Sequence, residues 1–182
     1  MRTEIGYGDG YGDTEELPFF RNFRAGGVGS VRGFTSNSLG PKGALLLHVT
    51  EDTNLNGNLD DDQLWFEDPN SLGGNLLTEF SMELIFPLPF VEDQRSMRSA
   101  MFIDAGNVFD TECLVLEPDT SGNTTHPSCI EGFDMDEIRV SAGVGLTWVT
   151  AIGPLTFTFA RDLNSKEDDK TEGFEFSLGQ VF

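Results

Sequence analysis

The hydrophobic and polar residues of this 182-residue chain alternate in several segments of about ten residues each. In the segment 75–86, for example, Leu84 and Phe86 fall on one face and Glu83 falls on the other. A period of two, with one apolar face and one small or polar face, is typical of β-strands, and this length suits a strand that crosses a membrane at a tilt. The pattern predicts six strands, at about residues 1–8, 75–86, 96–109, 137–149, 154–162 and 173–182.

The connections between these segments alternate between long and short along the chain. The long ones cover about residues 9–74 and 110–136, and the short ones about 87–94 and 150–153. A soluble β-sandwich also has alternating strands, but nothing sorts its connections by length, whereas an outer-membrane barrel has long extracellular loops and short periplasmic turns. We therefore expect an all-β fold that is part of an antiparallel transmembrane β-barrel. Because the smallest membrane barrels use about eight strands, we expect the whole barrel to be larger than this chain.

Composition and charge agree with this interpretation. The 21 glycines and 16 phenylalanines favour β structure over helix. No run of eighteen apolar residues exists, so we expect no transmembrane helix, while alternating barrel strands escape that test. Residues 1–7 read as strand, without the charged start and apolar middle of a signal peptide. The net charge of −20 argues against a nucleic-acid partner, which requires a basic surface, and fits acidic loops in water.

The longest predicted connection contains an unusual stretch, PFFRNFRAGGVGSVRGFTSNSLGP at residues 18–41. It shows neither strand nor helix periodicity, and its centre is formed by Val31, Arg32, Gly33 and Phe34. Frequent glycines permit positive φ angles and close backbone approach, so such a stretch could enter a narrow space. From this pattern alone it could equally be a glycine-rich surface loop that carries one arginine.

The stretch as a whole resembles the conserved loop of the BamA family, the insertases of the outer-membrane β-barrel assembly machinery. The likeness covers the Val-Arg-Gly-Phe core, the Pro-Phe-Phe-x-Asn-Phe-x-Ala-Gly-Gly before it and the Ser-Asn-Ser-Leu-Gly-Pro after it. It implies a barrel of about sixteen strands, of which this chain would be the C-terminal portion. The periplasmic POTRA domains and the earlier strands would be absent from the chain. The loop would be an extracellular loop inserted into the barrel lumen.

The resemblance also implies a function and partners. The protein would reside in the bacterial outer membrane and would fold and insert nascent β-barrel proteins there. Its partners would be those nascent proteins, the lipoproteins of the assembly machinery and the lipid bilayer. No covalent chemistry is implied, so we expect neither an enzyme nor a required cofactor.

The resemblance gives Arg32 two candidate partners in the lumen. Asp104 lies in Phe-x-Asp-x-Gly, which matches the strand motif that meets this arginine in the family, and Glu83 stands where the family has glutamate. An unpaired guanidinium in a partly dry interior is costly, whereas a bidentate carboxylate contact satisfies its planar fork. The alternative is that both acids only face water in the lumen.

The last predicted strand carries apolar residues at a spacing of two. They are Phe174, Phe176, Leu178 and Phe182. The pattern resembles the C-terminal recognition signal of outer-membrane barrels. Such a signal is an edge strand that a partner recognises through backbone hydrogen bonds and through alternate side chains. Gln180 departs from it, because the family often has an apolar or aromatic residue there. In the family this strand also forms a seam with the first strand, and the seam opens laterally toward lipid.

Two other functions remain open from the sequence. Two-partner secretion transporters and the related autotransporter-assembly proteins share the Val-Arg-Gly-Phe/Tyr core, although their flanks differ from those found here. A secreted calcium-binding β-protein would explain residues 52–63, but it would explain neither the terminal strand nor the order of loop lengths.

Residues 52–63 have the spacing of a calcium-binding loop. The oxygen ligands would come from Asp52, Asn54, Asn56, Asn58 and Asp60. Gln63 replaces the bidentate glutamate of the twelfth position, so we expect weak binding, with a Kd of about 10⁻⁴–10⁻³ M. The alternative is an ordinary acidic, solvated loop.

If calcium binds there, millimolar Ca²⁺ should protect residues 52–63 from proteolysis, and Asp52→Ala should abolish the protection. Mg²⁺ should substitute poorly, because it requires tight octahedral geometry and gives up its water reluctantly. Equal cleavage in calcium and in chelator would show that the stretch is an ordinary acidic loop.

Cys113 and Cys129 are the two cysteines of the chain, and both fall in the predicted connection 110–136. Outside the cell, a disulfide that closes this loop is favoured over a metal or redox site. Mass spectrometry of non-reduced peptides should therefore show Cys113 linked to Cys129. Free thiols in protein isolated from outer membranes would refute the pairing.

Overall fold

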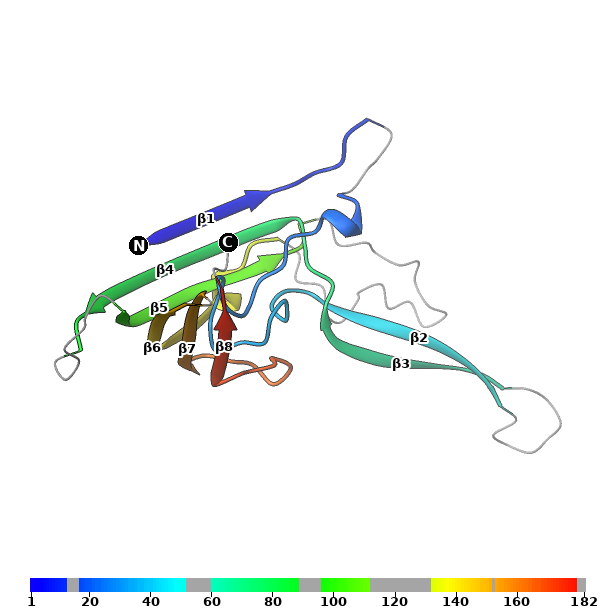
Figure 1. The fold of residues 1–182 in the computed structure, drawn as a ribbon. Coiled ribbons are helices and arrows are strands. Elements are labelled where there is room, and N and C mark those ends of the chain that lie inside the picture. The colour runs from blue at the N-terminus through cyan, green and yellow to red at the C-terminus, as the bar shows by residue number, and fades with distance from the viewer. Residues whose placement is uncertain (13–16, 52–59, 89–95, 112–131, 152, 180–182) are drawn as a thin grey trace.

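A computed structural model describes residues 1–12, 17–51, 60–88, 96–111, 132–151 and 153–179, with the backbone alone over 43–51 and 60–70. Its main body is a six-stranded antiparallel sheet in the order β1-β4-β5-β6-β7-β8. The strands are β1 (Arg2–Tyr7), β4 (Leu76–Phe86), β5 (Met97–Phe109), β6 (Arg139–Thr150), β7 (Gly153–Asp162) and β8 (Phe174–Leu178). The sheet curls without closing, with β1 at one edge and β8 at the other (Figure 1). The predicted fold class, an antiparallel part of a larger barrel, is confirmed.

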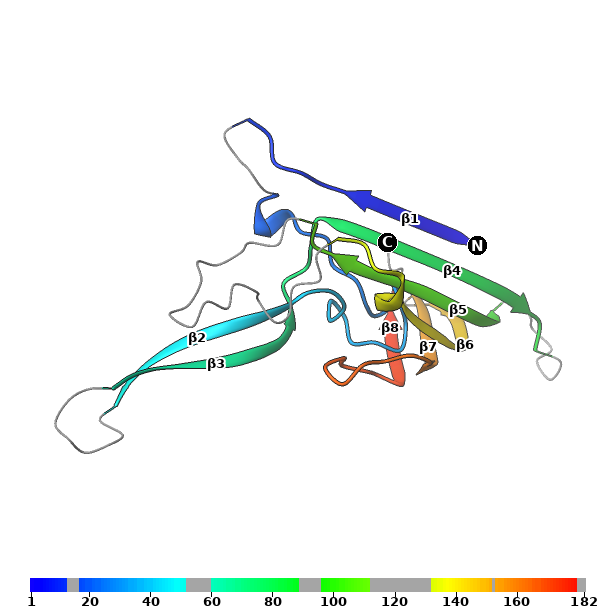
Figure 2. The same cartoon turned by 180° about the vertical axis from the view of Figure 1, so that it is seen from behind.

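The predicted connection over residues 9–74 contains a hairpin that the alternation of residues does not indicate. This region contains β2 (Lys42–Glu51) and β3 (Asp60–Ser71), which pair as an antiparallel hairpin. The hairpin extends away from the main sheet (Figure 2). Its strands escape the alternation test because β2 carries three leucines in a row and β3 begins with three aspartates. The ladder satisfies the backbone groups of both strands.

Helical structure in the residues that the structure describes is confined to two short turns. The 3₁₀ turns η1 (Phe19–Arg21) and η2 (Met135–Glu137) lie in the connections before β2 and before β6. Across the described part of the chain, no helix has the length and apolar character needed to span a membrane.

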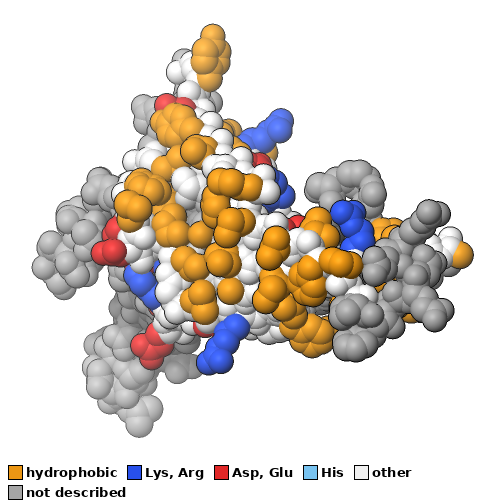
Figure 3. All heavy atoms as spheres, turned by 90° about the vertical axis from the view of Figure 1, so that its left-hand side faces the viewer, with side chains coloured by type: hydrophobic (Ala, Val, Ile, Leu, Met, Phe, Trp, Pro, Cys, Tyr) orange, Lys and Arg blue, Asp and Glu red, His pale blue; other side chains and the backbone are white. Residues whose placement is uncertain are grey.

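The convex face of the sheet is apolar. Large exposed side chains on this face include Met82, Leu84, Met101, Ile103, Val144, Trp148, Phe159, Phe174, Phe176 and Leu178. Hydrophobic side chains cover much of the face of the molecule seen in Figure 3. Aromatic rings pair across the last two strands, with centroids 5.2 Å apart for Phe157 and Phe176. An outward apolar band of this kind suits contact with lipid.

A small hydrophobic core lies on the opposite, concave side. It joins the connection after β1 to β4 and β5, and its buried members are Ala25, Val31, Phe34, Leu39, Leu77 and Val108. Phe23 packs against this cluster. The strands therefore bury their inward apolar residues against a loop rather than against a second sheet. This packing places the stretch around Arg32 inside the curve of the sheet.

Candidate functional site

The floor of the candidate site consists of two neighbouring rows of inward-facing residues across β4, β5 and β6. The register places Ser81, Asp104 and Ser141 in one row, and Glu83, Phe102 and Gly143 in the next. A Cβ at Gly143 would lie 2.6 Å from the Phe102 ring, so the glycine leaves the space that the ring occupies. The floor thus combines carboxylates with one aromatic face.

Residues 28–36, here called the Arg32 loop, lie against this floor because Gly33 has no side chain. Gly33 has a φ of +90°, and a Cβ there would lie 3.1 Å from the Ala160 Cβ and 3.4 Å from the Ser141 Cβ. A larger residue would be strained in its backbone and crowded against β6 and β7. Glycine at this position therefore lets the adjacent Arg32 reach the floor.

Arg32 makes a bidentate contact with Asp104. Its Nε lies 2.6 Å from Oδ2, and its Nη2 lies 2.9 Å from Oδ1 of the same carboxylate. The backbone N–H of Arg32 also donates to Oδ2, at 3.2 Å, and Ser81 Oγ donates to Oδ1, at 2.7 Å. Asp104 is fully buried, so its charge depends on these donors for compensation.

Two further groups complete the surroundings of the guanidinium. Arg32 Nη1 lies 2.6 Å from Glu83 Oε1, and the guanidinium carbon lies 3.5 Å from the centroid of the Phe102 ring. A cation above an aromatic face is attracted by the ring quadrupole. Burial by itself would lower the pKa of Arg32, but the contacts with Asp104 and Glu83 outweigh it and raise the pKa above its ordinary value. Arg32 therefore acts as a fixed cation and not as a proton donor.

The Arg32 loop is also paired with the connection between β7 and β8. The Thr35 N–H donates to the Lys170 carbonyl at 2.9 Å, and the Glu172 N–H donates to the Gly33 carbonyl at 3.0 Å. Between these bonds, Phe34 and Thr171 form an antiparallel bridge. The Phe34 side chain is completely buried. One side of the loop thus forms a short ladder with residues 170–172.

A third contact holds the start of the loop, and the sequence analysis missed it. Arg2 Nη2 lies 3.0 Å from Glu79 Oε2 and 2.5 Å from the Gly29 carbonyl oxygen, while Ser30 Oγ hydrogen-bonds the other Glu79 oxygen. Glu79 is buried, and its position on the polar face of a predicted strand was the available signal. Its partners lie about 50 and about 77 residues away in the chain, so no local pattern indicates them.

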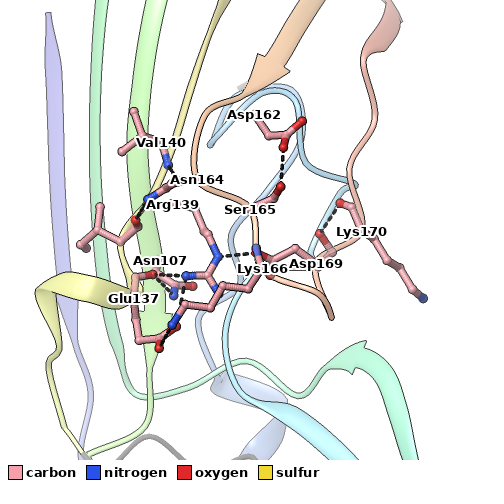
Figure 4. Close-up of polar contacts among 12 residues, drawn as sticks. Asn107, Glu137, Arg139, Val140, Asp162, Asn164, Ser165, Lys166, Asp169 and Lys170 are labelled. Atoms are coloured by element: carbon pink, nitrogen blue, oxygen red, sulfur yellow. Dashed lines mark hydrogen bonds and ion pairs between the residues drawn. The ribbon is translucent and has the colours of Figure 1, made fainter.

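A second ionic network, also missed, lies where the connections before β6 and after β7 meet (Figure 4). Arg139 Nε pairs with Asp169, and Arg139 Nη1 lies 3.1 Å from Glu137 Oε2. Lys166 pairs with the other Glu137 oxygen. Burial by itself would raise the pKa of Glu137, but the hydrogen bonds from Lys166 and Arg139 outweigh it and lower the pKa below its ordinary value.

A cavity of about 680 Å³ lies on the concave side of the sheet, beside the Arg32 loop. Arg32, Glu83, Arg98 and Thr158 are among the residues that line it. The contacts at this site hold the Arg32 loop against the sheet by ion pairs and hydrogen bonds.

Comparison with known proteins places this geometry in a family. The sequence profile of the Omp85 superfamily domain matches residues 1–182. The chain belongs to the Omp85 superfamily. It is 37% identical over 190 residues to the outer membrane protein assembly factor BamA of Neisseria meningitidis serogroup B, which covers 98% of this chain and 21% of that protein. A SAM50-like protein of Schizosaccharomyces pombe is 27% identical over 161 residues, covering 88% of this chain and 26% of that protein.

A solved Omp85 structure agrees with the fold. The crystal structure of BamA from Haemophilus ducreyi lacking POTRA domains 1–3 matches with a TM-score of 0.72 and 31% identity, over 96% of this chain and 29% of that chain. The chain spans about a fifth of the length of the Neisseria protein and about a quarter of the length of the Schizosaccharomyces protein.

The structure places each described residue of the predicted site. Arg32 contacts Glu83 and Asp104, Val31 and Phe34 belong to the small core, and Gly33 lies against β6 and β7. Phe174, Phe176 and Leu178 are exposed on the convex face, and Phe182 lies outside the described residues.

The predicted calcium loop and disulfide lie mostly outside the described residues. This holds for Asp52, Asn54, Asn56, Asn58, Cys113 and Cys129, while Asp60 begins β3, where only the backbone is described. Among the residues that the structure does describe, no group of three or more His, Cys, Asp or Glu side chains is placed to hold a metal ion. Both predictions remain as stated above.

Replacing Arg32 by alanine should release the Arg32 loop. The substitution leaves the buried Asp104 carboxylate unpaired, which costs on the order of 3–5 kcal/mol. Arg32→Lys should recover only part of this, because an ammonium cannot make the bidentate contact. The measurement is limited proteolysis of the loop in the full-length protein, with Arg161→Ala, an exposed arginine on β7, as the control. Unchanged protection in Arg32→Ala would contradict this account of the site.

Proposed function

We propose that the protein containing this chain is an outer-membrane assembly factor that folds and inserts β-barrel proteins into the bacterial outer membrane. The observation that carries the proposal is the Arg32 loop, held inside the sheet by Asp104 and Glu83 in a chain 37% identical to a BamA. The proposed partners are nascent β-barrel proteins, the lipoproteins of the assembly machinery and the lipid bilayer. Nucleic acid is not among them.

The proposed mechanism uses binding and no bond chemistry. β8 contains five residues, whereas β7 contains ten, and β8 is the last strand of the sheet within this chain. A short edge strand presents unpaired N–H and C=O groups, which can pair with an incoming strand. The apolar side chains of Phe174, Phe176 and Leu178 face outward beside that edge, toward the proposed lipid. We propose that this edge templates client strands, that the adjacent bilayer is thinned, and that neither enzyme chemistry nor a cofactor is required.

The Arg32 loop would support this work by stiffening the wall behind the edge strand. Through Gly33 and Phe34 it is bonded to residues 171–172, which lead directly into β8. A rigid inner support allows one edge of a sheet to stay open without the loss of the neighbouring pairings. The flanks of the motif favour this function over that of the secretion transporters that share its core.

The test is reconstitution of the full-length protein in lipid vesicles with a urea-unfolded outer-membrane β-barrel client. Client folding, followed as protease-protected and heat-modifiable protein, should be several times faster than in empty vesicles. Arg32→Ala and Asp104→Ala should lower the rate toward that of empty vesicles, and Arg161→Ala should not. Equal client folding with and without the wild-type protein would reject the proposal.

A further inference from the structure

The partner segment of the Arg32 loop is itself anchored, and its anchor lies on β6. Residues 163–172 connect β7 to β8, and their backbone pairs with Gly33 and Thr35. At the other end of this connection, Leu163 N–H donates to the Val140 carbonyl at 2.9 Å. What holds residues 169–172 in place therefore also determines where one side of the Arg32 loop can lie.

Asn164 supplies the first part of that anchor. Its amide Nδ2 donates to the Ile138 carbonyl at 2.6 Å, and its Oδ1 accepts the Val140 N–H at 2.6 Å (Figure 4). These two bonds extend the pairing of β6 with the connection beyond the end of the regular ladder. They fix the beginning of residues 163–172.

Asp169 supplies the second part and is the better buried of the two. Its side chain is 4% exposed, and its Oδ2 accepts both the Lys166 N–H, at 2.8 Å, and a hydrogen bond from Arg139 Nε. The Asp169 N–H in turn donates to the Lys166 carbonyl at 3.1 Å. Asp169 thus closes a turn over residues 166–169 and ties that turn to β6.

Arg139 joins three segments at this point. It begins β6, its Nε pairs with Asp169, and its Nη1 donates to the Glu137 carbonyl at 2.9 Å and to the Glu137 carboxylate at 3.1 Å. Its side chain is 8% exposed, so the positive charge is held largely out of water. Removal of Arg139 leaves the buried Asp169 carboxylate without its cation, and removal of Asp169 leaves Arg139 with Glu137 alone, so in either case the chain around the pair rearranges.

We propose that Arg139 and Asp169 are a positioning pair for the Arg32 loop. The pair holds residues 170–172 against the start of β6, and those residues hold Gly33 and Thr35 by the backbone. Arg32 is then kept above Asp104 from two independent sides, by its own ion pair and by this ladder. The consequence for client insertion rests on the function proposed above, whereas the positioning itself does not.

The test is hydrogen–deuterium exchange of the full-length protein in lipid nanodiscs, read by mass spectrometry. In Arg139→Ala and in Asp169→Asn, peptides that contain the Thr35 and Glu172 amides should exchange on the order of tenfold faster than in the wild type, because the ladder between them opens more often. Arg139→Lys should retain more protection than Arg139→Ala, because lysine keeps the positive charge but lacks the planar guanidinium that bonds both partners. Asp168→Asn, which changes an exposed neighbour, is the matched control and should leave exchange unchanged.

The exchange measurements distinguish the positioning pair from the proposed function. Faster exchange around Glu137 and Arg139 with unchanged exchange at Thr35 and Glu172 would overturn the proposal, because the network would be broken without effect on the Arg32 loop. Heat-modifiable mobility on gels reports that each variant is folded, and Asp169→Asn, which keeps the shape of the side chain, carries the test if Arg139→Ala does not fold. If the wild-type protein fails to insert clients while these exchange changes occur, the proposed function fails and the positioning pair stands.

Discussion

A single positive charge placed inside the curve of the sheet determines most of the described arrangement. Arg32 lies in an interior where its charge must be compensated, and Asp104, with no exposed surface, compensates it through two parallel hydrogen bonds. The pair works only at close range, so the loop must approach the sheet, and Gly33 and Gly143 provide the room. The phenyl ring of Phe102 fills the space beneath the guanidinium.

Other ionic contacts hold the loop at its remaining sides, and they share one property. Glu79 accepts hydrogen bonds from Arg2 and Ser30 at the start of the Arg32 loop. Asp169 accepts a hydrogen bond from Arg139 near the other end of that loop. In each case a buried acid accepts hydrogen bonds from two different segments of the chain. The loop is therefore held at several points along its length, and Val31 and Phe34 add apolar contacts in the small core.

Sequence patterns predicted the parts of this structure that repeat and missed the parts that do not. The strands of the main sheet follow from alternation, because one face meets an apolar surrounding and the other does not. The contact of Arg32 with Asp104 could be anticipated from motifs. The hairpin β2–β3 could not, since its apolar residues are contiguous. The pairing of Arg139 with Asp169 depends on how a non-periodic connection folds, which no spacing in the chain encodes.

The distances along the chain that these contacts span have a consequence for the order of events during folding. Arg32 and Asp104 are 72 residues apart, and Ser38 and Lys170, whose hydroxyl and carbonyl meet at 3.5 Å, are 132 apart. Contacts between such distant residues carry a large loop-closure cost until neighbouring strands have been brought together. Zippering of β4, β5, β6 and β7 removes that cost, strand by strand. We therefore expect the arginine to reach its carboxylate after β4 and β5 have paired, because that pairing brings the two distant segments together.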